Sequence, residues 1–95
     1  MKVRATFRYP VILEKGQRNY GVYAPDLPGC ISTGYTPEGS LRNMQEALHM
    51  HLETMLEDGD VIPPASPIDQ IEFDPNTETV HELEVEVQCG ERRAS

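Results

Sequence analysis

Apolar and polar residues alternate in two long segments, residues 2–13 near the start of the chain and residues 79–87 near its end. In the first segment every odd position is apolar. In the second segment the odd positions run from Thr79 to Val87 and end in three apolar residues, and the even positions are Val80 and three glutamates. A period of two is typical of a strand that buries one face. The sequence therefore predicts a half-buried strand at each end of the chain.

Two shorter runs between these segments, residues 20–24 and 30–34, also indicate strands. Polar residues 15–19 are of hairpin length, so we expect the first three strands to form an antiparallel meander. Pro10 lies inside the first strand and cannot donate to a strand ladder. We therefore expect an edge position or a β-bulge at Pro10.

The spacing changes to three and four residues between Leu41 and Leu56, which predicts one amphipathic helix of about twenty residues. Thr36 is suited to the N-cap and Pro37 to the first helical position. Asp58–Gly59 marks the expected end of the helix. Gly39 and Ser40 are weak helix formers, so fraying or close packing is expected in the first turn.

The remaining segments indicate a single domain, which we expect to span residues 1–88, followed by a flexible tail at residues 89–95. Residues 61–67 are proline-rich and predict an extended loop, and residues 68–73 predict a short helical turn or an irregular strap. The element order βββαβ predicts an α+β fold, with one helix packed on one face of a small antiparallel sheet. A second copy or a partner chain is then expected to cover the other face.

The turn at residues 25–29 (Pro-Asp-Leu-Pro-Gly) concentrates conformational stiffness at one corner. Each proline fixes φ, and a glycine can adopt positive φ without a steric penalty. An aspartate carboxylate in such a turn accepts hydrogen bonds from nearby backbone N–H groups, so we expect Asp26 to cap its own turn. The residues interpreted as structural in and after this corner are Pro25, Asp26, Pro28, Gly29 and Gly34.

The net charge of −8 is unevenly distributed, since residues 1–35 carry +3 and residues 36–95 carry −11. An acidic surface repels phosphate backbones and attracts basic proteins, so a basic protein partner is favoured over nucleic acid. Glu82, Glu84 and Glu86 in the last strand form a row of carboxylates that we predict to contact such a partner. The alternative stays open that this row is a solvated strand face whose charge prevents aggregation.

The sequence contains no arrangement of residues that indicates catalysis, a cofactor or a metal site. Nucleophilic catalysis needs a base beside the nucleophile, and no serine or cysteine has an evident one. His49 and His51 are two residues apart on the expected helix, so they do not share a face. Cys30 and Cys89 lack metal-type spacing and are interpreted as free thiols. No apolar window of about 18 residues and no signal peptide is present, which favours a cytoplasmic protein without membrane contact.

Several motifs together resemble the HicB antitoxin family over about residues 3–87. They are Tyr20–Gly–Val–Tyr–Ala–Pro–Asp–Leu–Pro–Gly–Cys30, then Gly34–Tyr–Thr–Pro37, the amphipathic helix, and Ile62–Pro–Pro–Ala–Ser66. The resemblance implies a partial RNase H-like βββαβ fold. It also implies binding of a HicA-type toxin, a small basic mRNA-cleaving ribonuclease whose active site the antitoxin blocks.

The sequence departs from that family pattern in three places. Many members continue into a C-terminal DNA-binding domain, whereas this sequence ends about eight residues after the last expected strand, so direct DNA binding by this chain alone is not expected. Glu38–Gly39–Ser40 replaces an acidic-acidic-Ala start of the helix. Asp26 is the single acid in the strand–loop core, so no nuclease activity is implied. An alternative is a regulatory domain without a toxin, self-associating as a homodimer or tetramer.

Overall fold

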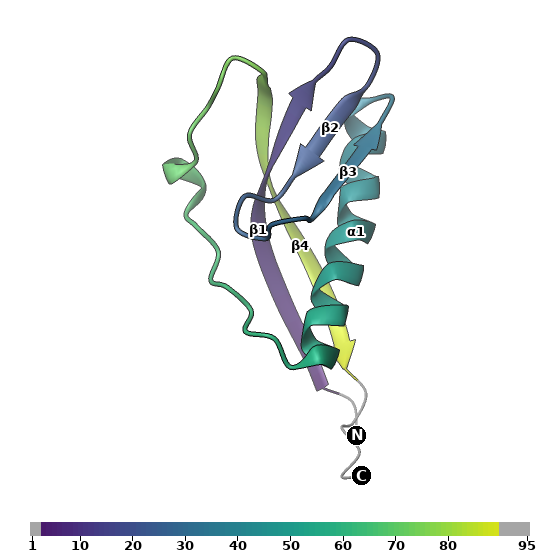
Figure 1. Ribbon diagram of the computed structural model, residues 1–95, viewed down its shortest axis with the longest axis vertical. Helices are drawn as coiled ribbons and strands as arrows, with labels where there is room; N and C mark the ends of the chain where they lie inside the picture. Colours follow the sequence, from purple (N-terminus) through teal and green to yellow (C-terminus); the bar gives the residue numbers. More distant parts are fainter. Residues whose placement is uncertain (1–2, 90–95) are drawn as a thin grey trace.

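The computed structural model describes residues 3–89, which form a four-stranded antiparallel sheet with one long helix packed on one face (Figure 1). The elements follow the order β1 (Val3–Lys15), β2 (Tyr20–Tyr23), β3 (Ile31–Gly34), α1 (Pro37–Asp58), the short 3₁₀ helix η1 (Ile68–Gln70) and β4 (Thr77–Cys89). The α+β fold and the order βββαβ are confirmed. Of the tail expected at residues 89–95, all but Cys89 lies outside the described residues.

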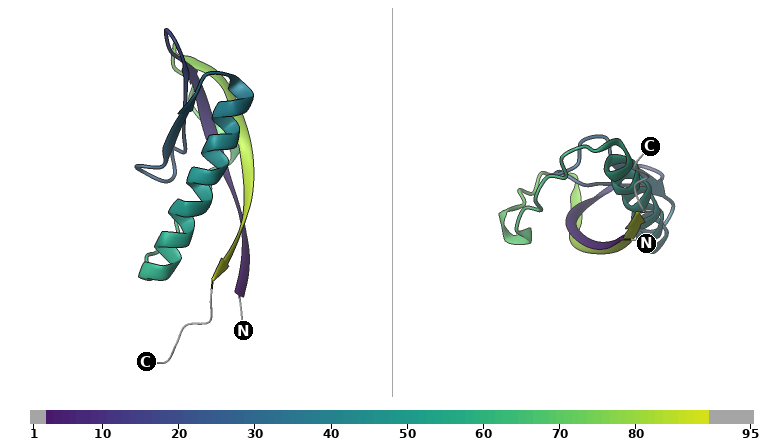
Figure 2. Two further views of the ribbon diagram at one scale, coloured as in Figure 1. Left: turned by 90° about the vertical axis from the view of Figure 1, so that its right-hand side faces the viewer. Right: turned by 90° about the horizontal axis from the view of Figure 1, so that it is seen from below.

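The sheet has the strand order β3-β2-β1-β4, and its strands differ greatly in length. β1 and β4 contain 13 residues each and pair along their whole length. β2 and β3 contain four residues each. The pairing between β1 and β2 is limited to residues 12–15 of β1. The first half of β1 and the second half of β4 therefore form a two-stranded ribbon, which twists past α1 (Figures 1 and 2).

Pro10 lies in this two-stranded ribbon, opposite Glu82 of β4. Because the pairing with β2 begins at Ile12, Pro10 has a strand neighbour on one side only. The expected edge position is confirmed locally, although β1 is a central strand at its other end. The register shift of β1 lies between Leu13 and Glu14 instead of at Pro10.

The core forms between α1 and the face of the sheet that carries the odd-numbered residues of β1. Met44, Leu48 and Leu52 of α1 are fully buried, which confirms the helical spacing of the sequence. Burial of each such side chain contributes about 1.5–3 kcal/mol. The sheet and the turn before β3 contribute the other buried apolar residues of this cluster, which are Tyr9, Val11, Leu13, Val22, Ala24, Leu27, Cys30, Val85 and Val87.

Both ends of α1 are capped by the residues that the sequence indicated. The Thr36 hydroxyl accepts a hydrogen bond from the Gly39 N–H at 2.9 Å. Gly59 ends the helix with φ of 74°, and its N–H donates to the Leu56 carbonyl at 3.2 Å. A left-handed glycine at this position satisfies carbonyls that would otherwise lack partners.

The strap, defined here as residues 60–76, runs from the end of α1 past the β1–β4 ribbon to the start of β4 (Figure 1). The expected extended loop and short helical turn are confirmed, and η1 contacts β4. Ile12 is buried on the face opposite α1, and Tyr23 lies beside it on that face. The pKa of Tyr23 is raised mainly by burial, then by the Glu14 carboxylate and then by the Asp74 carboxylate of the strap. The chain itself therefore covers part of the sheet face opposite α1, a face that a second copy or a partner chain was expected to cover.

Candidate functional site

The turn at residues 25–29 is closed by its own backbone and anchored in the core. The Ala24 N–H donates to the Cys30 carbonyl at 3.1 Å, and the Cys30 N–H donates to the Leu27 carbonyl at 3.0 Å. Leu27 is fully buried, and Gly29 has φ of 86°. Positive φ at Gly29 is the conformation that glycine adopts at low cost. A hydrogen-bonded turn is thus present at this corner, with its apolar residue inserted into the core.

Asp26 connects this turn to the strap rather than capping the turn itself. Its Oδ2 accepts from the Ser66 N–H at 2.8 Å, and its Oδ1 accepts from the Ser66 hydroxyl at 2.6 Å. The sequence predicted that this carboxylate would accept from amides of its own turn. The structure differs because folding brings Ser66 to this carboxylate from 40 residues away. Hydrogen bonds to a charged acceptor are stronger than neutral ones, so this pair fixes the strap to the turn.

Tyr9 provides a second attachment for the strap. Its hydroxyl donates to the Pro63 carbonyl. Burial, and secondarily the nearby Asp26 carboxylate, raise the pKa of Tyr9, so the hydroxyl keeps its proton and remains a donor. The two attachments lie at Pro63 and Ser66, both within the motif that follows the helix in the sequence. That motif was noted from the sequence, but its contacts with Tyr9 and Asp26 were missed.

Gly34 lies where β3 passes beneath the first turn of α1. A Cβ placed on Gly34 would lie 2.6 Å from the Ser40 Oγ and 2.7 Å from the Ser40 backbone nitrogen. Ser40 is fully buried, and its hydroxyl donates to the Thr36 carbonyl at 2.7 Å. The weak helix formers at the start of α1 therefore serve close packing, one of the two outcomes that the sequence left open.

A groove of about 590 Å³ separates the turn at residues 25–29 from α1. Met50 and Ile31 stand at this groove with exposed fractions of 66% and 65%. Cys30 is buried beside them, and burial raises the pKa of its thiol to about 11, so the sulfur is neutral near pH 7. The lining is mostly apolar and consists of Gly29, Cys30, Ile31, Ala47, Met50, His51, Thr54, Met55 and Asp60.

The predicted glutamate row lies on the face of β4 opposite the core. Glu84 accepts from Arg8 through Nη2 at 2.9 Å and through Nε at 3.2 Å. Glu82 lies 4.0 Å from Arg8 Nη1, and Glu86 lies 3.9 Å from Arg4 Nη1. The carboxylates are exposed, but each has an arginine neighbour on β1. A contact between this row and a partner stays a prediction.

Within residues 3–89, no group of three or more His, Cys, Asp or Glu side chains is arranged to hold a metal ion. His49 and His51 are half-buried on α1. None of the helices in this part of the chain is long and apolar enough to cross a membrane.

Solved structures that share this fold include antitoxin domains. The N-terminal domain of the Burkholderia pseudomallei antitoxin HicB superposes with a TM-score of 0.64 at 30% identity, covering 83% of this chain and 95% of that one. A chain of the HicA3 and HicB3 toxin–antitoxin complex superposes with a TM-score of 0.59 at 26% identity, covering 85% of this chain and 95% of that one. The fold is thus that of HicB N-terminal domains.

The family model described as HicB-like antitoxin of bacterial toxin–antitoxin systems matches residues 9–93. This chain therefore belongs to the HicB-like antitoxin family. An uncharacterized 14.9 kDa protein of Haemophilus phage HP1 is 44% identical over 62 residues, covering 65% of this chain and 47% of that protein. A UPF0150 protein of Thermoplasma acidophilum is 35% identical over 57 residues, covering 59% of this chain and 83% of that protein. The match thus spans about half the length of the phage protein.

Proposed function

We propose that this chain is an antitoxin that binds a small basic, mRNA-cleaving HicA-type toxin and occludes its active site. The observation that carries the proposal is the similarity to a solved toxin–antitoxin complex, in which one chain shares this fold over 95% of its length. Family membership over residues 9–93 supports the same function.

The charge of the chain supports a basic partner. A net charge of −8 on 95 residues favours association with a positively charged protein and accelerates the encounter. The carboxylate of Asp26 holds Ser66 of the strap, so a structural role for this turn is supported.

Co-expression with a HicA-type toxin tests the proposal, and a short open reading frame next to this chain's gene is the place to seek that toxin. Growth arrest by the toxin alone, relieved by this chain, is the expected result. Purified toxin is then expected to stop cleaving RNA when one equivalent of the chain is added. Unrelieved arrest together with undiminished cleavage would contradict the proposal.

A second candidate is a self-associating regulatory domain without a toxin, assembled as a homodimer or tetramer. Exposed large apolar side chains favour it, since Ile31, Tyr35 and Met50 are at least 65% exposed. Ile31 and Met50 line the same groove, and exposed apolar side chains that gather in one place often mark an interface. Sedimentation velocity over a hundredfold concentration range measures this, and a monomer throughout would exclude it. A homo-oligomer is also compatible with toxin binding.

The glutamate row is the contact surface predicted from the sequence, and reversal of charge tests it. Glu82→Lys, Glu84→Lys and Glu86→Lys together would abolish toxin capture if the row were the interface. A basic partner would first have to compete with Arg4 and Arg8 for these carboxylates, which lowers the net gain. Toxin capture by the triple variant at wild-type strength would remove the row from the interface.

A further inference from the structure

The groove between the turn at residues 25–29 and α1 has two rigid walls. The turn wall is held by its backbone hydrogen bonds, by burial of Leu27 and by the Asp26–Ser66 pair. The other wall is the central part of α1, which is fixed to the core through Met44, Leu48 and Leu52. A preformed groove binds without the entropic cost of ordering its own walls.

The groove can accept an apolar side chain and allow a backbone to approach closely. Met50, Met55 and Ala47 supply apolar lining, and methionine adapts its shape to different occupants. Gly29 has no side chain, and no atom lies within 4 Å of the position its Cβ would take. The turn backbone is thus accessible at one wall of the groove.

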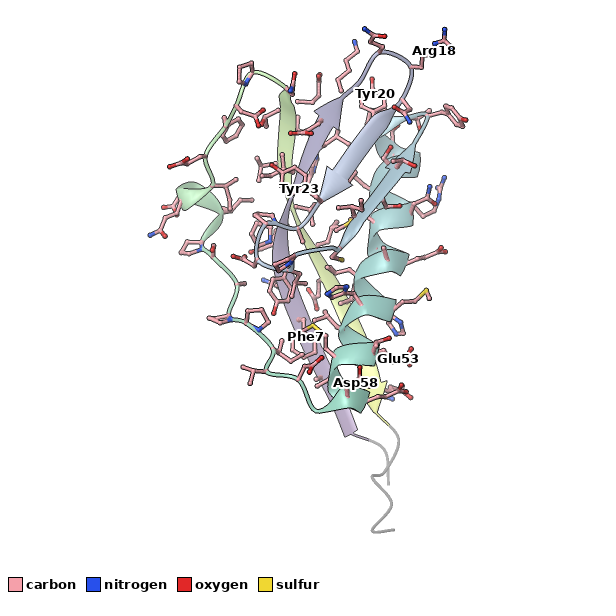
Figure 3. The ribbon with its side chains drawn as sticks, in the orientation of Figure 1. Phe7, Arg18, Tyr20, Tyr23, Glu53 and Asp58 are labelled. Carbon is pink, nitrogen blue, oxygen red and sulfur yellow. The ribbon has the colours of Figure 1, made fainter. Side chains whose placement is uncertain are left out.

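One end of the groove carries an acidic residue and lies near others. Asp60 lines it, and Glu53 and Asp58 lie near the same C-terminal end of α1 (Figure 3). No basic residue lies in the last turn of α1, where the helix dipole is also negative. Lysine or arginine beside the groove is therefore favoured, whereas a second copy of this acidic chain would add like charge.

We propose that this groove receives an aliphatic side chain of the basic partner, and that a lysine or arginine next to that side chain pairs with Asp60. The inference rests on the proposed function, because the partner is taken to be the HicA-type toxin. It assigns the interface to the helix side of the sheet. The glutamate row of β4 lies on the opposite face, where its carboxylates already have arginine neighbours.

Two matched substitutions separate the two faces. Thr54 is exposed and lines the groove, and Thr6 is exposed on β1 opposite Glu86, so Thr54→Arg and Thr6→Arg add the same side chain and charge to either face. Isothermal titration with a purified, catalytically inactive HicA-type toxin measures the affinity. We expect Thr54→Arg to weaken binding at least about tenfold and Thr6→Arg to change it less than about twofold.

Met50→Lys at the rim gives an independent check, and thermal melting of each variant confirms that it is folded. Wild-type affinity in both Thr54→Arg and Met50→Lys would overturn the inference, as would a loss of affinity confined to Thr6→Arg. A change in the oligomeric state of Thr54→Arg, with toxin affinity intact, would assign the groove to a second copy and overturn it too. Failure of the wild-type chain to bind the toxin would instead overturn the proposed function.

Discussion

Asn43 and Gln45, two residues apart on α1, donate hydrogen bonds to the two outer strands of the sheet. Asn43 Nδ2 donates to the Thr33 carbonyl of β3 at 2.9 Å, and Gln45 Nε2 donates to the Glu84 carbonyl of β4 at 2.7 Å. Residues two apart on a helix point to opposite sides, so one helix reaches both edges. These contacts fix the rotation of α1 over the sheet and occupy one carbonyl on each edge strand.

Asn43→Ala and Gln45→Ala are each expected to lower the free energy of unfolding by about 0.5–1.5 kcal/mol. Because the two contacts are on opposite edges and share no partner, the double variant is expected to show the sum of the two losses. Urea unfolding measures all three, with Glu46→Ala on the exposed face as the control. Alanine has the highest helix propensity, so none of these substitutions loses stability through propensity. A loss in the control equal to that in Asn43→Ala would therefore mean that the edge contacts are not responsible.

The Asp26–Ser66 pair is expected to stabilise the fold through an interaction that neither residue makes alone. Asp26→Ala and Ser66→Ala should each reduce the free energy of unfolding by about 1–3 kcal/mol, since each leaves a partly buried polar group without its partner. The double variant should lose less than the sum, and a denaturation-based double-mutant cycle measures the difference. Strict additivity would show that the two residues act independently.

Gly34 and Gly21 lie on adjacent strands but meet very different surroundings. Gly34→Ala places a methyl group within 3 Å of Ser40 backbone atoms, so we expect a loss of about 1–3 kcal/mol from overpacking. No atom lies within 4 Å of a Cβ on Gly21, so Gly21→Ala is the matched control and should change stability little. Equal melting temperatures for the two variants would contradict the close approach of β3 and α1.

Local patterns predicted the elements of this fold well, because strand alternation, helical spacing and caps depend on neighbouring residues. Thr36, Pro37 and Gly59 bound α1 as expected. The contacts that assemble the elements were not predictable in this way. Asp26 meets Ser66 across 40 residues, and Arg8 meets Glu84 across 76.

The alternation of apolar and polar residues predicted the exposed and buried faces of β4, but no pattern in the sequence predicted the groove. It forms from a turn and a helix that touch only in the folded chain, and its lining residues Gly29, Ala47 and Thr54 have no chemistry that a sequence pattern would reveal. The turn at residues 25–29 was visible in the sequence as a stiff corner. Its place in the wall of a groove required the tertiary structure.

Ionisation of the buried Cys30 thiol should couple to unfolding at alkaline pH. Burial raises the pKa of this thiol from 9.0 to about 11, so the folded state holds the proton more tightly than the unfolded state. The contribution of this thiol to the free energy of unfolding is fully present below pH 9 and is lost as the pH rises from 9 to 11. In that range the unfolded chain binds fewer protons than the folded chain, so a rise in pH favours unfolding.

Urea unfolding of the wild type between pH 8 and pH 10 is therefore expected to show a decline in stability that is shallower in Cys30→Ala. Burial also raises the pKa values of Tyr9 and Tyr23 from 10.0. Their ionisation therefore lowers the free energy of unfolding in the same way, but mainly at still higher pH. In a Cys89→Ser background, which leaves Cys30 as the one cysteine, reaction of the native thiol with a disulfide reagent at pH 8 should be slow. It should become fast in urea, since the thiolate is the nucleophile. Parallel stability–pH curves for the two proteins, or rapid reaction of the native thiol, would show that Cys30 is accessible to solvent.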